Sequence, residues 1–281
     1  MTLSTFRRVT QLSSTILANS YIGSLYTKTV NTSILKAICV PFLNCYACPT
    51  ALCSCPIGTM QHFMAIQTVP FYLIGFIALV GITIGRMACG WVCPFGFLQD
   101  LMYKIKSQKF KIPYPFKFVK YLVLVFLVFI IPYRSGELWF SKLCPAGTLT
   151  AGIPWALWNP MNPSTGLPVL PGGPGPIFYL SLVILFGFLI WFVVSKRPFC
   201  RVACPIGALL SFFNRYSMIR LEASPECDGC ETCTTICPMD LNVYADLDSG
   251  ECIRCLECTL CEHVRLVTSF DLAREVRCSK R

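Results

Sequence analysis

The sequence has few charged residues, and acidic residues are rare outside its C-terminal part. Only 14% of the 281 residues are charged, whereas a soluble domain has about 25%. The chain has two histidines and lacks a Walker A loop, a GxGxxG turn, a CxxCH haem motif and any Ser/His/Asp grouping. These absences argue against a nucleotide-binding protein, a c-type cytochrome or a serine hydrolase. Hydrophobic residues make up 54% of the chain, and its mean hydropathy of +0.60 predicts an integral membrane protein.

Apolar runs of suitable length support that prediction. A bilayer core of about 30 Å requires about 20 helical residues. Residues 65–85 and 176–195 carry no charge, and residues 117–133 carry only Lys117 and Lys120 near one end. Residues 9–27 are also uncharged but rich in Ser, Thr and Asn. We therefore predict an all-α membrane helix bundle of about four spans.

The charges divide the chain into two parts and orient it. Residues 1–222 hold 18 Lys and Arg against 3 Asp and Glu, and residues 223–281 hold 6 against 11. With both termini inside, 14 basic residues fall on the inner side of the four spans and 4 on the outer side, which follows the positive-inside rule. We predict a membrane domain over 1–222 and a cytoplasmic domain over 223–281. The basic residues flank apolar runs, so no nucleic-acid partner is expected; the acidic part is either a solvated surface or a docking face.

The C-terminal part contains most of a bacterial ferredoxin motif. Nineteen cysteines are present in the chain, and eight of them form two runs with Cys-x2-Cys spacing in this part. In that motif the fourth cysteine of a run ligates the other cluster. We predict an α+β ferredoxin-like domain with two [4Fe–4S] clusters: cluster 1 on Cys227, Cys230, Cys233 and Cys261, and cluster 2 on Cys252, Cys255, Cys258 and Cys237. Zinc is the alternative, because Cys-x2-Cys pairs also bind zinc.

A shorter pattern, Cys-Pro-x-Gly, occurs four times, with one predicted span between successive copies. The copies begin at Cys55, Cys93, Cys144 and Cys204. Proline suits the first turn of a helix, whose free N–H groups would then favour a thiolate or an anionic cluster. On the inner side, Cys89, Cys93, Cys200 and Cys204 supply four thiolates, and we predict a third [4Fe–4S] cluster there. The alternative is two unmetallated thiol pairs.

The outer side carries a further group of cysteines. Cys45, Cys48, Cys53 and Cys55 could hold a fourth cluster, with Cys144 as a substitute ligand. Disulfides form readily outside the cytoplasm, so a disulfide or a redox-active dithiol is the alternative for this group.

These motifs together resemble a known family. The segment Cys89-Gly90-Trp91-Val92-Cys93-Pro94, the pair Cys200 and Cys204 with Pro205, and the ferredoxin-like tail are similar to the NapH/MauN-like membrane polyferredoxins, a group related to the membrane part of NosR. The resemblance implies a multi-pass protein of a prokaryotic cell membrane with cytoplasmic [4Fe–4S] clusters. It implies an electron-transfer subunit rather than a stand-alone enzyme, with a ferredoxin, a flavoprotein, a reductase or quinone as partner.

Three functions remain open on the sequence. The first is conduction of electrons between a cytoplasmic donor and a site at the outer face. The second is a quinol-linked relay that works at one face only. The third is a membrane thiol–disulfide carrier that cycles the outer cysteines.

Overall fold

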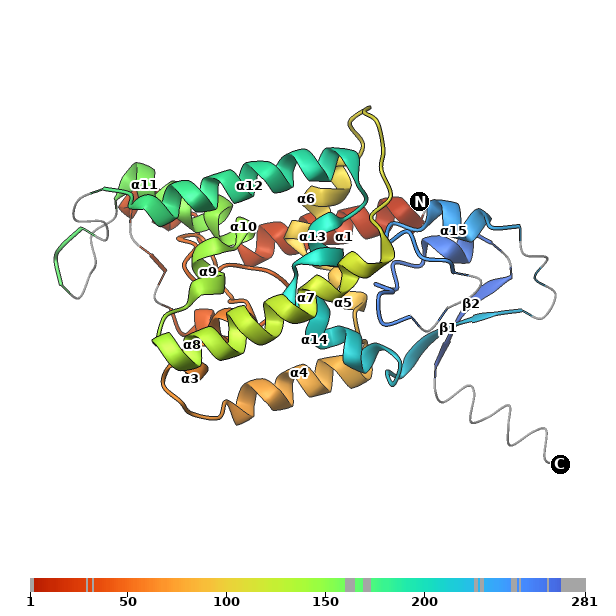
Figure 1. Ribbon diagram of the computed structural model, residues 1–281, viewed down its shortest axis with the longest axis horizontal. Helices are drawn as coiled ribbons and strands as arrows, with labels where there is room; N and C mark the ends of the chain where they lie inside the picture. The colour runs from red at the N-terminus through yellow and green to blue at the C-terminus, as the bar shows by residue number, and fades with distance from the viewer. Residues whose placement is uncertain are drawn as a thin grey trace.

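A bundle of helices runs along the long axis of the computed structural model, with a small sheet at one end (Figure 1). The structure describes residues 3–28, 30–31, 33–159, 165–168, 173–224, 227, 230–243, 247, 249–261 and 263–268. Cys278 and most of the Pro- and Gly-rich stretch after Asn159 lie outside these residues. We call the end of the bundle next to the sheet the sheet end, and the opposite end the far end.

Four helical segments form the length of the bundle. They are α1 (Leu3–Ala18), α4 (Phe71–Thr83), the continuous run α7 (Val119–Leu122), η3 (Val123–Ile130) and α8 (Ile131–Ser135), and α12 (Pro176–Val194). Among the described residues, Tyr114–Ser135 and Pro176–Val194 are long and apolar enough to cross a membrane. These two segments correspond to the predicted spans 117–133 and 176–195.

The other two predicted spans have different bounds in the structure. Within 65–85 the helix covers only 13 residues, about 20 Å, because Pro70 precedes it and Gly85 has a left-handed φ of 58° that follows its end. Within 9–27 the helix ends at Ala18, and it begins already at Leu3. The helix includes Arg7, whose side chain is buried near Asp100 and forms an ion pair with Glu257.

All four Cys-Pro-x-Gly copies begin helices, as the pattern predicts. The helices are α3 (Pro56–Ala65), α6 (Pro94–Met102), α10 (Pro145–Gly147) and α14 (Pro205–Asn214). In each, the cysteine has extended backbone and proline is the first helical residue, where its missing N–H costs no hydrogen bond. Figure 1 places α3 and α10 toward the far end, and α6 and α14 nearer the sheet end.

Short elements connect these helices. They are α2 (Gly23–Thr27), η1 (Ile34–Ala37), α5 (Met87–Trp91), η2 (Tyr114–Phe118), α9 (Trp139–Leu143), η4 (Thr148–Gly152), α11 (Ile153–Trp158) and α13 (Pro198–Val202).

The tail folds around an antiparallel pair of strands. Strand β1 (Ile219–Ala223) pairs with β2 (Val264–Thr268), with Leu221 opposite Leu266. Between them lie α15 (Thr232–Ile236) and η5 (Glu257–Leu260), which pack together. Because β1 crosses the predicted boundary at residue 222, the last residues of the predicted membrane domain belong to the same sheet as the tail.

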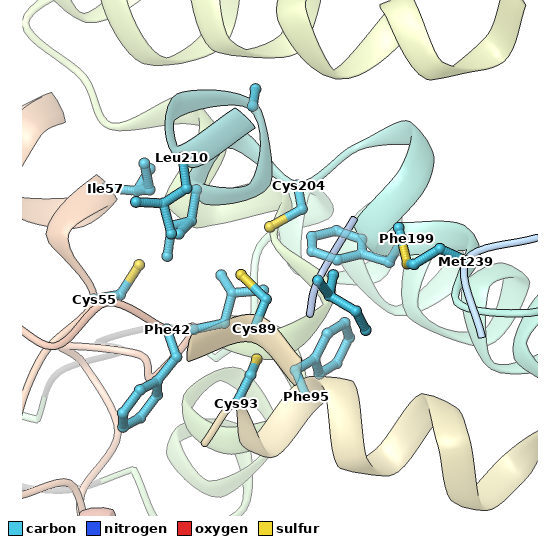
Figure 2. Packing of buried hydrophobic residues seen from close by; sticks show 14 of the residues in the cluster. Phe42, Cys55, Ile57, Cys89, Cys93, Phe95, Phe199, Cys204, Leu210 and Met239 are labelled. Atoms are coloured by element: carbon cyan, nitrogen blue, oxygen red, sulfur yellow. The ribbon is translucent and has the colours of Figure 1, made fainter. Parts of the chain in front are cut away.

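Aromatic side chains pack around cysteines in the core at the sheet end. Phe95 makes edge-to-face contacts with Phe199 at 5.1 Å and with Phe192 at 5.5 Å between ring centroids. Figure 2 shows Phe95 and Phe199 beside Cys89, Cys93 and Cys204. This core therefore fixes the positions of thiol groups as well as of apolar side chains.

Candidate iron–sulfur sites

Four cysteines from two distant segments meet in the core at the sheet end. Cys89 lies on α5 and Cys200 on α13, while Cys93 and Cys204 directly precede α6 and α14. Each is between 4% and 6% exposed. Burial raises the pKa of the Cys204 thiol, and the thiols of the other three raise it further, so all four lie within electrostatic reach of one another. Figure 2 shows three of them directed toward a common space.

We call Cys89, Cys93, Cys200 and Cys204 the inner group, and hydrogen-bond donors point at three of its sulfurs. The N–H of Gly96 donates to Cys93 Sγ and the N–H of Gly207 donates to Cys204 Sγ, each at 3.4 Å. Gln99 Nε2 donates to Cys200 Sγ at 3.2 Å. Free amides at a helix N-terminus stabilise a negative charge. The donors are thus placed to stabilise thiolates or an anionic cluster.

Close contacts favour glycine at the last position of the Cys-Pro-x-Gly pattern. A β-carbon on Gly96 would lie 3.1 Å from the Cys89 carbonyl oxygen, and one on Gly207 would lie 3.1 Å from Arg86 Nη2. At Gly58 a β-carbon would lie 2.4 Å from the Tyr46 ring. The glycine therefore allows neighbouring groups to approach each helix start.

Two buried arginines link the two halves of the inner group, and the sequence analysis did not find them. Arg197 Nη1 donates to the Cys89 carbonyl at 3.0 Å, and Arg86 Nη2 donates to the Cys200 carbonyl at 3.5 Å. Arg86 is 0% and Arg197 1% exposed. Each arginine thus reaches the opposite cysteine pair. The sequence contains a signal for these two residues, namely an arginine three residues before each Cys-x3-Cys segment. In the sequence analysis both arginines serve only to predict membrane topology.

Each arginine also binds a carboxylate. Arg86 Nη1 lies 3.0 Å from Glu251, which Lys120 also binds, and Arg197 Nε donates to Asp100 at 2.7 Å. Burial opposes ionisation of Glu251, but the charges of Arg86 and Lys120 outweigh it and lower its pKa. Glu251 directly precedes Cys252 of the tail, so Arg86 touches both the inner group and the tail.

A second group of four cysteines lines a cavity in the tail. Cys237, Cys252, Cys255 and Cys258 surround it together with apolar side chains that include Leu221, Met239 and Ile253. Burial raises the pKa values of Cys255 and Cys258 to about 12, and neighbouring thiols of the same four contribute. These are the four residues that the crossed-ligation pattern assigns to cluster 2.

The loop of this second group packs directly on α5. Gly90 lies so close to it that an added β-carbon would be 2.6 Å from the Ile253 carbonyl oxygen. Trp91 Nε1 donates to the Arg254 carbonyl at 3.0 Å. Since Gly90 follows Cys89 and Ile253 follows Cys252, the second group and the inner group are neighbours.

The cysteines predicted for cluster 1 are less enclosed. Cys233 is buried, Cys227 and Cys261 are half-buried and Cys230 is exposed. Burial raises the pKa of Cys233, and the Cys261 thiol contributes, which places these two near each other. Residues 225–226 and 228–229 lie outside the described part of the chain. This group is therefore the most accessible of the tail.

At the far end, three cysteines line another cavity. Cys45, Cys55 and Cys144 surround it with Tyr46 and Phe140. Burial raises the pKa of Cys45 to about 12, and the thiols of Cys144 and Cys48 add to the effect. We call Cys45, Cys48, Cys55 and Cys144 the far-end group.

Two further cysteines of the same loop, Cys53 and Cys39, have other neighbours. Cys53 Sγ accepts a contact from Asn44 Nδ2 at 3.7 Å and does not line the cavity. Cys39 Sγ lies 3.7 Å from the Thr59 hydroxyl. Of the five residues predicted for the outer site, the structure thus groups Cys144 with Cys45 and Cys55. Neither Cys48 nor Cys53 lines that cavity, and Cys48 Sγ lies 3.3 Å from the Thr50 hydroxyl.

One residue connects the far-end cavity to the inner group. The Leu43 backbone lies close enough to the Cys93 sulfur to favour the ionised thiol, while Leu43 also lines the far-end cavity. The loop that carries Cys39 to Cys55 therefore enters the bundle as far as the inner cysteines. In Figure 2, Cys55 appears in the same core as Cys89 and Cys93.

These surroundings fit [4Fe–4S] clusters in chemical terms. Thiolates ligate such clusters, and hydrogen bonds to sulfur and nearby cations stabilise their negative charge. The inner group has four buried thiols, three donors directed at sulfur and two buried arginines. Within the described residues, no group of three or more His, Cys, Asp or Glu side chains is arranged to hold a single metal ion.

Comparison with known proteins agrees with this chemistry. Residues 68–113 and 177–221 each match a family described as 4Fe-4S binding domain. Each match contains one apolar helix, one buried arginine and one Cys-x3-Cys-Pro segment, which indicates a duplicated unit. No solved structure gives a significant match.

Several relatives are similar over much of the chain. An uncharacterized protein of Methanocaldococcus jannaschii is 31% identical over 221 residues, which cover 74% of this chain and 83% of that protein. The methylamine utilization ferredoxin-type protein MauN of Methylobacillus flagellatus is 28% identical, over 58% of this chain and 51% of MauN. The ferredoxin-type protein NapH of Escherichia coli is 24% identical, over 62% of this chain and 58% of NapH. The chain thus spans little more than half the length of MauN and NapH.

Proposed function

This chain is a member of the NapH/MauN-like ferredoxin-type proteins, and we propose that it conducts electrons through a membrane along four [4Fe–4S] clusters. The observation that carries the proposal is the continuity of the cysteine groups. Gly90 on α5 lies against Ile253 of the tail cavity, and Leu43, which lines the far-end cavity, lies near Cys93 of the inner group. A bilayer core of about 30 Å is too wide for an electron to cross in one step. Successive clusters must therefore lie close to one another, and these contacts bring neighbouring cysteine groups together.

In this proposal, Cys227, Cys230, Cys233 and Cys261 hold the cluster that meets a soluble partner. Cys237, Cys252, Cys255 and Cys258 hold the next, and the inner and far-end groups hold the third and fourth. When bound, each cluster takes up and releases one electron at a time. The exposure of Cys230 supports entry or exit of electrons at the tail.

The protein's own residues have separate roles in this arrangement. The amides of Gly96 and Gly207 and the Gln99 side chain stabilise charge on the inner sulfurs. Arg86 holds the Cys252 loop against the inner group, because it binds both Glu251 and the Cys200 carbonyl. Apolar side chains such as Leu221 and Met239 exclude water from the tail cavity.

We place the protein in the cell membrane with the tail in the cytoplasm. The two long apolar helices, the shorter α1 and α4 parallel to them, and the excess of basic residues on one side support this topology. The donor and acceptor are then a soluble electron carrier at the tail and a second partner at the far end.

A quinol-linked relay is the second candidate, and one cavity favours it. Next to Cys45, a cavity with about 1080 Å³ of empty space, its open mouth included, is lined by Tyr46, Trp155 and Phe178. Aromatic walls beside a redox site suit a flat ring. Re-oxidation of reduced clusters by added quinone, lost in Trp155→Ala, would support this candidate.

Iron analysis of the anaerobically purified protein tests the main proposal. Four clusters predict about 16 iron atoms per chain, and the tail alone predicts about 8. We expect Cys89→Ala and Cys55→Ala each to lower the iron content. A value near 8 that neither substitution changes would contradict the conduit.

A further inference from the structure

A basic pocket lies at the sheet end between the bundle and the tail, beside the inner group and the tail cysteines. It is bounded by the start of α1, the end of α6 and tail residues Ile236, Pro238 and Glu257. Five of its lining side chains are cationic: Arg7, Arg8, Lys104, Lys196 and Arg197. Only two are acidic, Asp100 and Glu257, so the pocket has a clear excess of positive charge.

Two of the five cations already have enough partners. Arg197 binds both oxygens of Asp100. Lys196 lies 3.3 Å from Asp240 and donates to the carbonyls of Thr235 and Cys237 at 3.0 Å. These two cations therefore shape the pocket and leave the binding capacity to the other three.

Arg7 has donors without acceptors although it is buried. Its side chain is 5% exposed, and its Nη2 lies 3.1 Å from Glu257. Its Nε and Nη1 form no hydrogen bond, since Asp100, at 3.6 Å from Nη1, is already engaged by Arg197. A buried donor without an acceptor is costly and rare in folded proteins. Arg8 and Lys104, both exposed, form no ion pair with a described residue.

We propose that this pocket binds a phosphate group, with Arg7 as its buried cation and Arg8 and Lys104 at its mouth. Arginine and lysine side chains donate charged hydrogen bonds to phosphate oxygens. Such a group belongs either to an anionic phospholipid headgroup or to a soluble phosphate compound. The pocket shares Arg197 with the inner group, but the proposal does not depend on the number of clusters.

The first experiment measures binding of inorganic phosphate to the detergent-solubilised, delipidated full chain by calorimetry under anaerobic conditions. We expect saturable binding that Arg7→Gln weakens about tenfold or more, as expected for loss of charged hydrogen bonds. Arg8→Gln and Lys104→Gln change exposed side chains, so they test the site even if Arg7→Gln fails to fold, and each should weaken binding several-fold. Arg215→Gln, an exposed arginine outside the pocket, removes the same charge and should have no effect.

A second arm identifies the source of the phosphate. Native mass spectrometry of protein from vesicles of phosphatidylcholine with added phosphatidylglycerol should show retained anionic lipid if the headgroup is the ligand, and that lipid should compete with inorganic phosphate. Phosphate binding without such competition assigns the pocket to a soluble compound.

Three results would overturn the proposal. One is no phosphate binding up to about 10 mM. Another is phosphate binding by the Arg8→Gln and Lys104→Gln variants that is as tight as phosphate binding by the control variant Arg215→Gln. The third is an Arg7→Gln variant that shifts a cluster potential while phosphate binding stays unchanged, because the arginine would then serve the tail cluster alone.

Discussion

Gly90 on α5 lies against the carbonyl oxygen of Ile253 in the tail, where an added β-carbon would come within 2.6 Å. The opposing atom belongs to backbone, so a side chain on Gly90 can be accommodated only if the Cys252 loop moves. This contact joins the inner group to the tail cavity.

Gly90→Ala should therefore separate the tail from the bundle. We expect a loss of about 1–3 kcal/mol in the free energy of unfolding, typical of overpacking, and slower electron transfer from tail to inner clusters. Freeze-quench electron paramagnetic resonance of the stepwise reduction measures the second effect. Gly75→Ala is the control, because nothing lies within 4 Å of a β-carbon there. Equal transfer rates in the two variants would show that the contact is dispensable.

Removing the charge of Glu251 should destabilise the protein strongly. Glu251→Gln leaves Arg86 and Lys120, both 0% exposed, without their shared carboxylate. Breaking a buried ion pair from one side costs about 3–5 kcal/mol. Chemical denaturation in detergent measures the change.

The matched control for Glu251 is Glu137→Gln. Glu137 pairs with Lys142, and the exposed fraction is 53% for the Glu137 side chain and 38% for the Lys142 side chain. Such a surface pair contributes about 0–1 kcal/mol. Similar losses for both variants would argue against a structural role of the buried network.

Gln99 should raise the potential of the inner cluster. Its Nε2 donates to Cys200 Sγ at 3.2 Å, and a donor to sulfur favours the more negative reduced state. Gln99→Leu should lower the potential by about 60 mV, the one-electron equivalent of one charged hydrogen bond.

Gln99→Glu separates this electrostatic role from a packing role. It keeps an acceptor for the Phe199 N–H but loses the donor to sulfur, so the potential should fall here as well. Potentiometric titration with resonance detection measures both variants, and an unchanged potential in both would contradict the assignment.

Cys144 and Cys53 should behave differently when removed. The structure groups Cys144 with Cys45 and Cys55 in one cavity and places Cys53 beside Asn44. Cys144→Ala should lose about 4 iron atoms per chain, and Cys53→Ala should lose none. Loss of iron from Cys53→Ala but not from Cys144→Ala would instead support the set Cys45, Cys48, Cys53 and Cys55 that the loop spacing predicts. A mass shift that reports a disulfide between Cys45 and Cys55 in native protein would favour the thiol carrier.

Local features of this fold could be predicted from the sequence. Cys-Pro begins a helix at all four sites because proline restricts its own backbone and lacks an N–H, which are properties of one residue. The proximity of Cys89 and Cys93 to Cys200 and Cys204 agrees with the predicted topology, in which both pairs follow apolar runs and lie on one side.

Long-range pairing could not be predicted in the same way. The role of Arg86 depends on Glu251 and Cys200, which are far away in sequence, so its charge indicated only topology. The burial of Arg7 within α1 depends on Asp100 and Glu257, which are far away in sequence. The place of Cys144 depends on how the loop with Cys45 enters the bundle, which no spacing rule describes.

Electron transfer across a vesicle membrane tests the central claim most directly. The full chain is reconstituted in liposomes that enclose a membrane-impermeant electron acceptor, and an impermeant reductant is added outside, with protein-free liposomes as the leak control. The four-cluster path predicts reduction of the enclosed acceptor by the native protein and its loss in Cys89→Ala and Cys144→Ala. Full reduction of the tail clusters while the enclosed acceptor stays oxidised would contradict it.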